Sequence, residues 1–176
     1  MRVKLLHYTD VNAVRDVLQS EGASFDSKTL LDHVAYMFEI EDCSRVTTHQ
    51  LVRHRVASYD QESQRFSSAS REGFVSPPTV ASNQAAMKVY DDALKVVYEA
   101  FERMTALGVP KEDARYVLPN AIKTKLVMTV YARSLMHIVW QRTALQAQWE
   151  IREVVTEMFR LAKEATPELW TAILEG

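Results

Sequence analysis

The pattern of hydrophobic and polar positions predicts a mixture of helices and short strands. The clearest helix covers residues 83–107, where apolar side chains recur at helical spacing, and Gly108 and Pro110 then end it. A strand is predicted over residues 33–41, which alternate in part and are rich in Val, Tyr, Phe and Ile. These segments indicate an α+β protein.

The remaining predicted elements are shorter. Strands are expected over residues 3–7 and 121–130, helices over 10–19, 45–52, 133–141 and 147–165, a last short helix from Pro167, and a helical turn over 111–116. Asp10 is a candidate cap of the first helix, and Asp42 or Ser44 of the second. Residues 56–78 are polar and serine-rich and are predicted to be irregular. There is no internal repeat, so residues 1–176 are expected to form one helix-rich domain with a small, mostly antiparallel sheet.

Composition narrows the classes of protein that the chain can represent. Its 21 Lys and Arg against 23 Asp and Glu give a formal net charge of −2, which offers no argument for nucleic acid or an anionic membrane as a partner. Cys43 is the only cysteine, so a disulfide framework within one chain is excluded. Without an apolar signal segment or a run of ~18 apolar residues, we expect a cytoplasmic protein.

Glycine is scarce, and this limits how a nucleotide could be bound. The four glycines are widely separated, which excludes a Gly-rich phosphate loop of the G-x-G-x-x-G or Walker A kind. Side chains and helix ends must therefore hold any phosphate.

The densest group of polar side chains lies in residues 53–65. Three arginines, one histidine and two serines fall within these 13 residues. Arginine offers a planar fork of donors that matches a phosphate or a uracil-like imide edge. Asp60 and Glu62 could hold the arginines in position or accept from a ligand. A solvated polar loop is the alternative interpretation.

Three later arginines stand among apolar neighbours. They are Arg115, Arg133 and Arg142. Because arginine is rarely buried unless it is paired or liganded, several half-buried arginines in a net-acidic protein suggest an anion pocket. Ion pairs with Glu112, Asp113 or Glu150 are the rival explanation.

Other candidate residues carry weaker signals. His137 lies four residues after Arg133 and hence on the same helical face. No H-x-x-x-H or H-E-x-x-H pair occurs, so no metal site is expected. Trp140 and Trp149 occupy helical apolar positions and are predicted to lie in the core, as is Cys43.

Several segments match one known set of motifs. Residues 53–65 fit R-H-R-x-x-S-x-x-x-x-S-x-R, with serines at Ser58 and Ser63. Residues 114–119 fit A-R-x-V-L-P, and residues 131–152 are similar to N-A-R-S-L-x-N followed by R and A-Q-x-E-I-R. Asp32-His33 with Gln50 resembles an E-H…Q segment. In these motifs the chain resembles the flavin-dependent thymidylate synthases.

The resemblance implies a fold, an assembly and a reaction. The fold would be an α+β domain of the ThyX type over residues 1–176, with a shorter N-terminal region than is usual in the family. The assembly would be a homotetramer with active sites at subunit interfaces. Family members bind FAD, dUMP, methylenetetrahydrofolate and NADPH, and methylate C5 of the uracil ring to give dTMP.

Carried over position by position, the resemblance assigns roles to individual residues. FAD is expected to contact Arg53, His54, Arg55, Arg133, His137 and Gln148. The uracil nucleotide is expected to contact Gln50, Arg53, Gln61, Glu62, Ser63, Arg65, Arg115 and Arg142. Two of these are expected to be catalytic: Arg142 would polarise the uracil ring where negative charge develops, and Ser63 would position the substrate without acting as a nucleophile.

Some positions depart from the family pattern. The two asparagines of N-A-R-S-L-x-N are Tyr131 and His137, the Asn-Glu pair of the signature is Asp60-Gln61, and residues 27–31 lack a histidine that the family has there. Most of these positions fall on the flavin side, so weaker FAD retention is expected.

Besides dUMP methylation, the sequence leaves open two other functions. The protein could be a C5 methylase acting on UMP in nucleoside natural-product metabolism, or a catalytically impaired nucleotide-binding relative.

Overall fold

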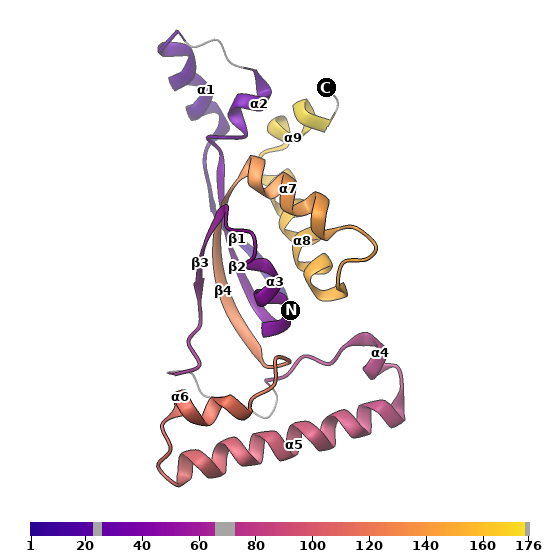
Figure 1. Cartoon of the computed structure of the whole chain (residues 1–176). Coiled ribbons are helices and arrows are strands. Elements are labelled where there is room, and N and C mark those ends of the chain that lie inside the picture. Colours follow the sequence, from indigo (N-terminus) through magenta and orange to yellow (C-terminus); the bar gives the residue numbers. More distant parts are fainter. Residues whose placement is uncertain (23–25, 66–72, 175–176) are drawn as a thin grey trace.

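The protein is built from a small antiparallel sheet against which several helices pack (Figure 1). The computed structural model describes residues 1–22, 26–65 and 73–174. The strands are β1 (Arg2–Tyr8), β2 (Ala35–Ser44), β3 (Ala57–Gln61) and β4 (Lys123–Tyr131). The helices are α1 (Val11–Ser20), α2 (Ser27–Leu30), α3 (Arg45–Leu51), α4 (Pro78–Ala81), α5 (Gln84–Ala106), α6 (Lys111–Ala114), α7 (Ala132–Arg142), α8 (Trp149–Ala165) and α9 (Pro167–Leu174), with a 3-10 turn, η1, at Arg115–Val117. The predicted α+β class is confirmed.

The strand order in the sheet is β1-β2-β4-β3, and all neighbouring strands are antiparallel. β2 and β4 are therefore central, and their paired residues Phe38 and Met128 are both buried. The register of this pair shifts between Ile40 and Cys43, where Asp42 has a φ of 58°. Aspartate tolerates this left-handed conformation better than most residues. The shift lies just before the end of β2, where α3 begins.

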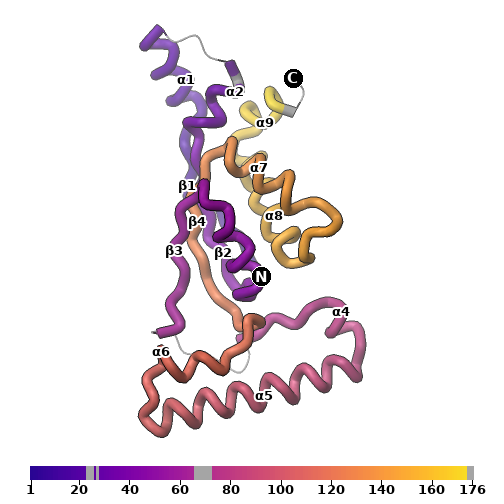
Figure 2. The backbone as a smooth tube through the Cα atoms, viewed as in Figure 1, coloured from indigo at the N-terminus to yellow at the C-terminus, as the bar shows by residue number. Residues whose placement is uncertain are grey.

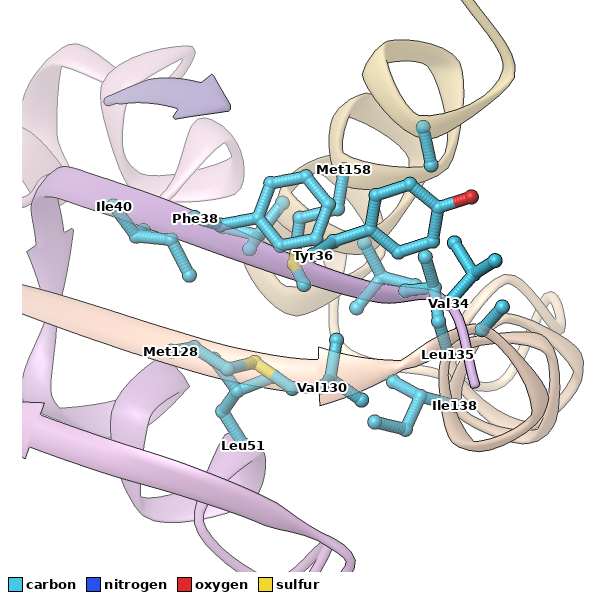
Figure 3. Close-up of a cluster of buried hydrophobic side chains, with 14 of the residues drawn as sticks. Val34, Tyr36, Phe38, Ile40, Leu51, Met128, Val130, Leu135, Ile138 and Met158 are labelled. Atoms are coloured by element: carbon cyan, nitrogen blue, oxygen red, sulfur yellow. The ribbon is translucent and has the colours of Figure 1, made fainter. Parts of the chain in front are cut away.

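The hydrophobic core lies between the central strands and helices α3, α7, α8 and α9 (Figure 3). On β2, Tyr36, Phe38 and Ile40 are buried and alternate with more exposed residues, as expected for a strand with one covered face. Trp170 on α9 is also buried, and its Nε1 donates to the Tyr36 hydroxyl at 3.0 Å. Cys43 lies in this core as predicted, and burial raises the pKa of its thiol to about 12.

Side-chain caps confirm several of the predicted helix starts. Asp10 caps α1, Ser44 caps α3 and Asn83 caps α5; in each case the side-chain oxygen accepts backbone N–H groups of the first turn. Of the two candidate caps of α3, Ser44 is the correct one. Gly108 follows α5 with a φ of 86°, a conformation that glycine adopts without steric cost.

One part of the secondary-structure prediction is wrong. Residues 56–78, predicted to be irregular, contain strand β3 and reach the start of α4. β3 is short and polar, and it pairs only with β4, at the edge of the sheet. Pairing with its neighbour, rather than its own hydrophobicity, makes it a strand, and such pairing leaves little signal in the sequence. Residues 66–72 lie outside the described residues.

The long helix α5 lies across one end of the sheet beside α4 and α6, while α1 and α2 lie at the opposite end (Figures 1 and 2). Phe101 is the one residue of α5 that is buried, and Val89 and Val96 are exposed. Among the described residues, no helix has both the length and the apolar character needed to cross a membrane.

Trp140 does not lie in the core, which corrects a second prediction. Its side chain is 75% exposed. Helix α7 buries the face that carries Leu135 and Ile138, and Trp140, two residues after Ile138, lies on the other side of the helix. Trp149, at the start of α8, is half-buried.

Candidate functional site

The residues from Arg53 to Arg55 form a tight turn between α3 and β3. The backbone N–H of His54 donates to the carbonyl of Leu51 at 3.1 Å. The hydroxyl of Tyr59, on β3, shares its proton between the carbonyl oxygens of Leu51 (2.8 Å) and His54 (2.9 Å). Burial raises the pKa of Tyr59 to about 12, so this hydroxyl stays protonated and donates. The turn is thus held with His54 buried and both arginines exposed.

Arg142, at the end of α7, reaches this turn from a distant part of the chain. Its Nε donates to His54 Nε2 at 2.9 Å, and its Nη2 donates to the carbonyl of Gln50 at 3.3 Å. Neither partner atom is negatively charged, and no carboxylate among the described residues pairs with Arg142. The half-buried guanidinium is therefore held in position while its positive charge stays unneutralised.

The contact between Arg142 and His54 requires a neutral imidazole, because Nε2 must accept. Burial, and then the positive charges of Arg142 and His137, lower the pKa of His54 from 6.5 to about 4. With Nε2 as the acceptor, the proton of the neutral ring lies on Nδ1. His54 is thus a hydrogen-bond acceptor near neutral pH, and its second ring nitrogen is a donor.

A second group of polar residues lies at the other end of β3, around α6. Arg65 pairs with the Glu112 carboxylate at 2.7 Å, and Arg115 Nε donates to the Glu112 carbonyl at 3.1 Å. The Ser63 hydroxyl accepts from the backbone N–H of Arg65 at 3.3 Å. The structure thus brings together three of the residues expected to contact the nucleotide. The five residues of β3, about 16 Å of strand, separate this group from Arg142.

Gln61 and Glu62 hold the end of β3 and keep part of their polar groups available. The side-chain amide of Gln61 donates to the hydroxyls of Thr48 (3.0 Å) and Thr124 (3.3 Å). The backbone N–H of Glu62 donates to the Lys125 carbonyl at 2.9 Å, while its side chain is exposed. The side-chain oxygen of Gln61 and the carboxylate of Glu62 are therefore the groups that could face a ligand.

Arg133, expected beside the flavin, lies at the start of α7 in an ion pair. Both Nε and Nη2 donate to the carboxylate of Asp32, the second at 2.8 Å. Arg133 is exposed, so the expectation that it is half-buried is wrong. The rival explanation of ion pairing holds for this arginine, with Asp32 as the partner. Its charge is therefore already neutralised within the protein.

His137 and Gln148 are the other residues expected along the flavin. His137 is exposed on α7, and its ring lies 6.2 Å from that of Trp140. The side-chain oxygen of Gln148 accepts from the backbone N–H of Ile151 at 3.0 Å and so caps α8, which leaves its amide nitrogen as a donor. In the part of the chain that the structure describes, no three His, Cys, Asp or Glu side chains gather as metal ligands.

Sequence reasoning missed Glu150 as a supporting residue of the site. Glu150 is 1% exposed and accepts from the backbone N–H of Ser44 (2.7 Å) and the hydroxyls of Ser44 (2.5 Å) and Thr47 (2.8 Å). It therefore joins α8 to the start of α3, and it is not the arginine partner considered above. Its position inside the A-Q-W-E-I-R motif was the available signal.

Sequence reasoning also missed Arg45, in the first turn of α3. Its Nη2 donates to the carbonyl of Glu62 at 3.0 Å, next to Ser63. The sequence carried no clear signal for this role, because the burial of Thr47, Thr48 and Leu51 on the same helix is seen only in the structure. An arginine in such a short, largely buried helix needs an anionic or carbonyl partner.

A family model described as "Thymidylate synthase complementing protein" matches residues 9–168. The chain is 41% identical over 167 residues to a flavin-dependent thymidylate synthase of Geobacter sulfurreducens, covering 94% of this chain and 70% of that protein. It is 41% identical over 148 residues to the flavin-dependent thymidylate synthase of Nitratidesulfovibrio vulgaris, covering 80% of this chain and 60% of the relative. The chain thus spans between about half and two thirds of the length of the second relative and of two further flavin-dependent thymidylate synthases.

Among solved structures, the fold is similar to that of thymidylate synthase X (ThyX) from Helicobacter pylori, described with FAD and dUMP. The TM-score is 0.72 at 24% identity, and the match covers 92% of this chain and 93% of the other. At this identity the likeness establishes the fold. The family assignment rests on the family model and on the identity to the sequence relatives. The chain belongs to the flavin-dependent thymidylate synthase family.

Proposed function

We propose that this protein methylates C5 of dUMP to give dTMP, using methylenetetrahydrofolate, NADPH and FAD. The family assignment and the shared name of its relatives support this reaction. The observation that carries the proposal is the position of Arg142, whose guanidinium is fixed by His54 and the Gln50 carbonyl without a neutralising carboxylate.

Arg142 can stabilise the charge that the reaction places on the uracil ring. C5 attacks the one-carbon unit as a nucleophile, and it does so best when the ring already carries negative charge on an oxygen; a preorganised cation lowers the energy of that charged ring. A cation already paired with a carboxylate would do so less well. Because Arg142 Nη1 has no hydrogen-bond partner among the described residues, it keeps donors for a ring oxygen. His54 positions Arg142 and need not transfer a proton.

The residues present fit FAD as a cofactor. A dinucleotide needs cations for its pyrophosphate, and Arg53 and Arg55 are exposed without an ion pair in the described part of the chain. The exposed rings of His137 and Trp140 offer a surface beside which a flat ring system could lie. When bound, FAD supplies the hydride that completes the methyl group. The weaker FAD retention expected from the departures at Tyr131 and residues 27–31 stays a prediction.

The proposed contacts to the nucleotide come from the two polar groups at the ends of β3, one around Arg142 and the other around Arg65 and Arg115. Ser63, Arg65 and Arg115 would hold the phosphate, since cationic and hydroxyl donors gather there. We further propose that the protein is a cytoplasmic homotetramer with active sites at its subunit interfaces. In each copy, residues 1–176 would form one domain. The exposed apolar residues Val89 and Val96 on α5 support assembly, because an isolated chain would leave them in water.

A product assay tests the proposed reaction. The protein is incubated anaerobically with FAD, NADPH, methylenetetrahydrofolate and equal amounts of dUMP and UMP, and the products are separated by mass. We expect mostly dTMP. Mostly 5-methyl-UMP would replace dUMP by the ribonucleotide as acceptor. No product from folded protein that still binds a nucleotide would refute catalysis and favour the nucleotide-binding alternative.

A further inference from the structure

Arg45 carries a buried donor that the described part of the protein leaves unpaired. Its Nε is the one buried side-chain nitrogen or oxygen there without a hydrogen-bond partner. Nη2 donates to the Glu62 carbonyl at 3.0 Å, and Nη1 makes no hydrogen bond to a described residue. Buried donors of a cation are costly to leave unsatisfied. The missing partner of this guanidinium is therefore a feature to be explained.

The charges around Arg45 make the need for an anion stronger. No carboxylate pairs with it among the described residues. Burial and the positive charge of Arg115 lower its pKa, and the charge of Glu62 offsets this only in part. The carboxylate of Glu112 pairs with Arg65 instead. Two guanidinium groups, those of Arg45 and Arg115, thus share one region with a net excess of positive charge.

We propose that Arg45 is a further phosphate-binding residue of the nucleotide site, acting with Arg65 and Arg115. The inference rests on the proposed function, which places the nucleotide phosphate at these two arginines. Through the Glu62 carbonyl, Arg45 is bonded to the very segment that carries Ser63 and Arg65. A bound phosphate would accept from the donors that Arg45 has left and would separate the like charges of Arg45 and Arg115.

An oxyanion at this place has two possible sources, the nucleotide phosphate and a carboxylate of the folate. The neighbours of Arg45 favour the phosphate, because Glu62, Ser63 and Arg65 belong to the signature segment assigned to the nucleotide. The two sources are separated by experiment, since deoxyuridine lacks the phosphate and the KM for the folate is measured separately.

The test compares nucleotide and nucleoside binding by Arg45 variants of the FAD-loaded protein. Arg45→Met keeps the length of the side chain but removes its charge, and Arg45→Lys keeps the charge but loses the fork of donors. We expect Arg45→Met to weaken dUMP binding about ten- to a hundredfold in calorimetric titrations, the effect of one lost charged hydrogen bond. Binding of deoxyuridine and the KM for the folate should not change, and Arg45→Lys should fall in between.

The matched control is Arg15→Met. Arg15 is also half-buried, its Nη1 donates to Asn12 at 2.8 Å, and it lies on α1 at the other end of the molecule from α6 (Figure 1). This variant should bind dUMP as the unmodified protein does. Unchanged dUMP binding by Arg45→Met would overturn the proposal, and so would an equal loss of dUMP and deoxyuridine, or a change confined to the folate. If Arg45→Met does not fold, the same comparison is made with Arg45→Lys.

A measurement with inorganic phosphate distinguishes a failure of this inference from a failure of the proposed reaction. Phosphate should raise the midpoint of thermal unfolding of the unmodified protein more than that of Arg45→Met. If no dTMP forms but phosphate binding still depends on Arg45, the reaction is wrong and the anion site stands. If dTMP forms and phosphate stabilises both proteins equally, the reaction stands and Arg45 is not part of the site.

Discussion

The hydrogen bond between Arg142 and His54 joins residues 88 positions apart in the sequence. It determines the protonation of His54 and the orientation of the Arg142 guanidinium. The arginine fixes His54 as a neutral acceptor, and the buried imidazole in turn orients the guanidinium. Neither role is visible in the sequence, where each residue matches a separate motif. The motifs identified which residues matter, but the pairing depends on how α7 is placed against the turn after α3.

Removing the Arg142 side chain should slow methyl transfer strongly while leaving the fold intact. For Arg142→Ala we expect a loss of about a hundredfold to a thousandfold in kcat, because a fixed cation is lost where charge develops. Steady-state kinetics at saturating dUMP measure kcat directly. Arg160→Ala, an exposed arginine of α8 that pairs with Glu157 and Glu164, is the control and should keep normal turnover. Near-normal kcat for Arg142→Ala would contradict the assigned role.

His54 should make folding stability sensitive to mild acid. Its folded pKa of about 4 lies below its ordinary value of 6.5, so the unfolded chain binds the proton more readily. Near neutral pH both states are uncharged at this residue and no penalty arises. As the pH falls from about 6.5 toward 4, stability is lost.

The pH effect is measured by urea unfolding of the unmodified protein and His54→Gln at about pH 7 and pH 5. The unmodified protein should lose more stability between the two values than the variant. Carboxylates with lowered pKa, such as Asp32 and Glu41, lose their contribution mainly below pH 5 and in both proteins alike. An equal loss in the two proteins would show that His54 is not buried in its neutral form.

At the scale of elements, Glu150 holds the helix that leads into the candidate site. Glu150→Ala would leave the backbone N–H of Ser44 and the hydroxyls of Ser44 and Thr47 without their acceptor. We expect the free energy of unfolding to fall by about 3 kcal/mol or more, since unsatisfied buried donors cost about 1–3 kcal/mol each. Urea denaturation measures the change.

Glu153→Ala is the control for this measurement. Glu153 lies one turn later on α8 and is exposed, so its removal should change stability by no more than about 0.5 kcal/mol. A similarly small effect of Glu150→Ala would mean that α3 is held by its hydrophobic contacts alone. Glu150→Gln should fall between the two, because an amide oxygen still accepts but carries no charge.

The elements show which structural signals a sequence contains. Helix starts were predictable because Asp10, Ser44 and Asn83 are local caps whose partners lie in the next turn. Strand β3 was not, because its pairing with β4 involves residues more than sixty positions away. The same limit applies to the site. The arginines could be named from their motifs, whereas the ion pair of Arg133 with Asp32 depends on the assembled sheet.

At the scale of the whole molecule, α5 is the longest helix among the described residues, and the single chain leaves most of it uncovered. Its predicted apolar stripe is present, yet Phe101 alone is buried. Val89 and Val96 lie seven residues apart, on one side of the helix, and are 71% and 65% exposed. Such a surface is typical of a helix that packs against another copy.

A charge placed on this surface should therefore dissociate the proposed tetramer without unfolding the chain. For Val96→Glu we expect a smaller particle by size-exclusion chromatography with light scattering, an unchanged circular dichroism spectrum, and loss of dTMP formation, because the proposed active sites need more than one copy. Val17→Glu, at a valine of α1 that is 61% exposed, should assemble normally. If Val96→Glu has the same particle mass as the unmodified protein, α5 does not form the interface. If the unmodified protein is itself a monomer that makes dTMP, the active site lies within one chain, and the Arg142 and Arg115 groups must both reach one nucleotide along β3.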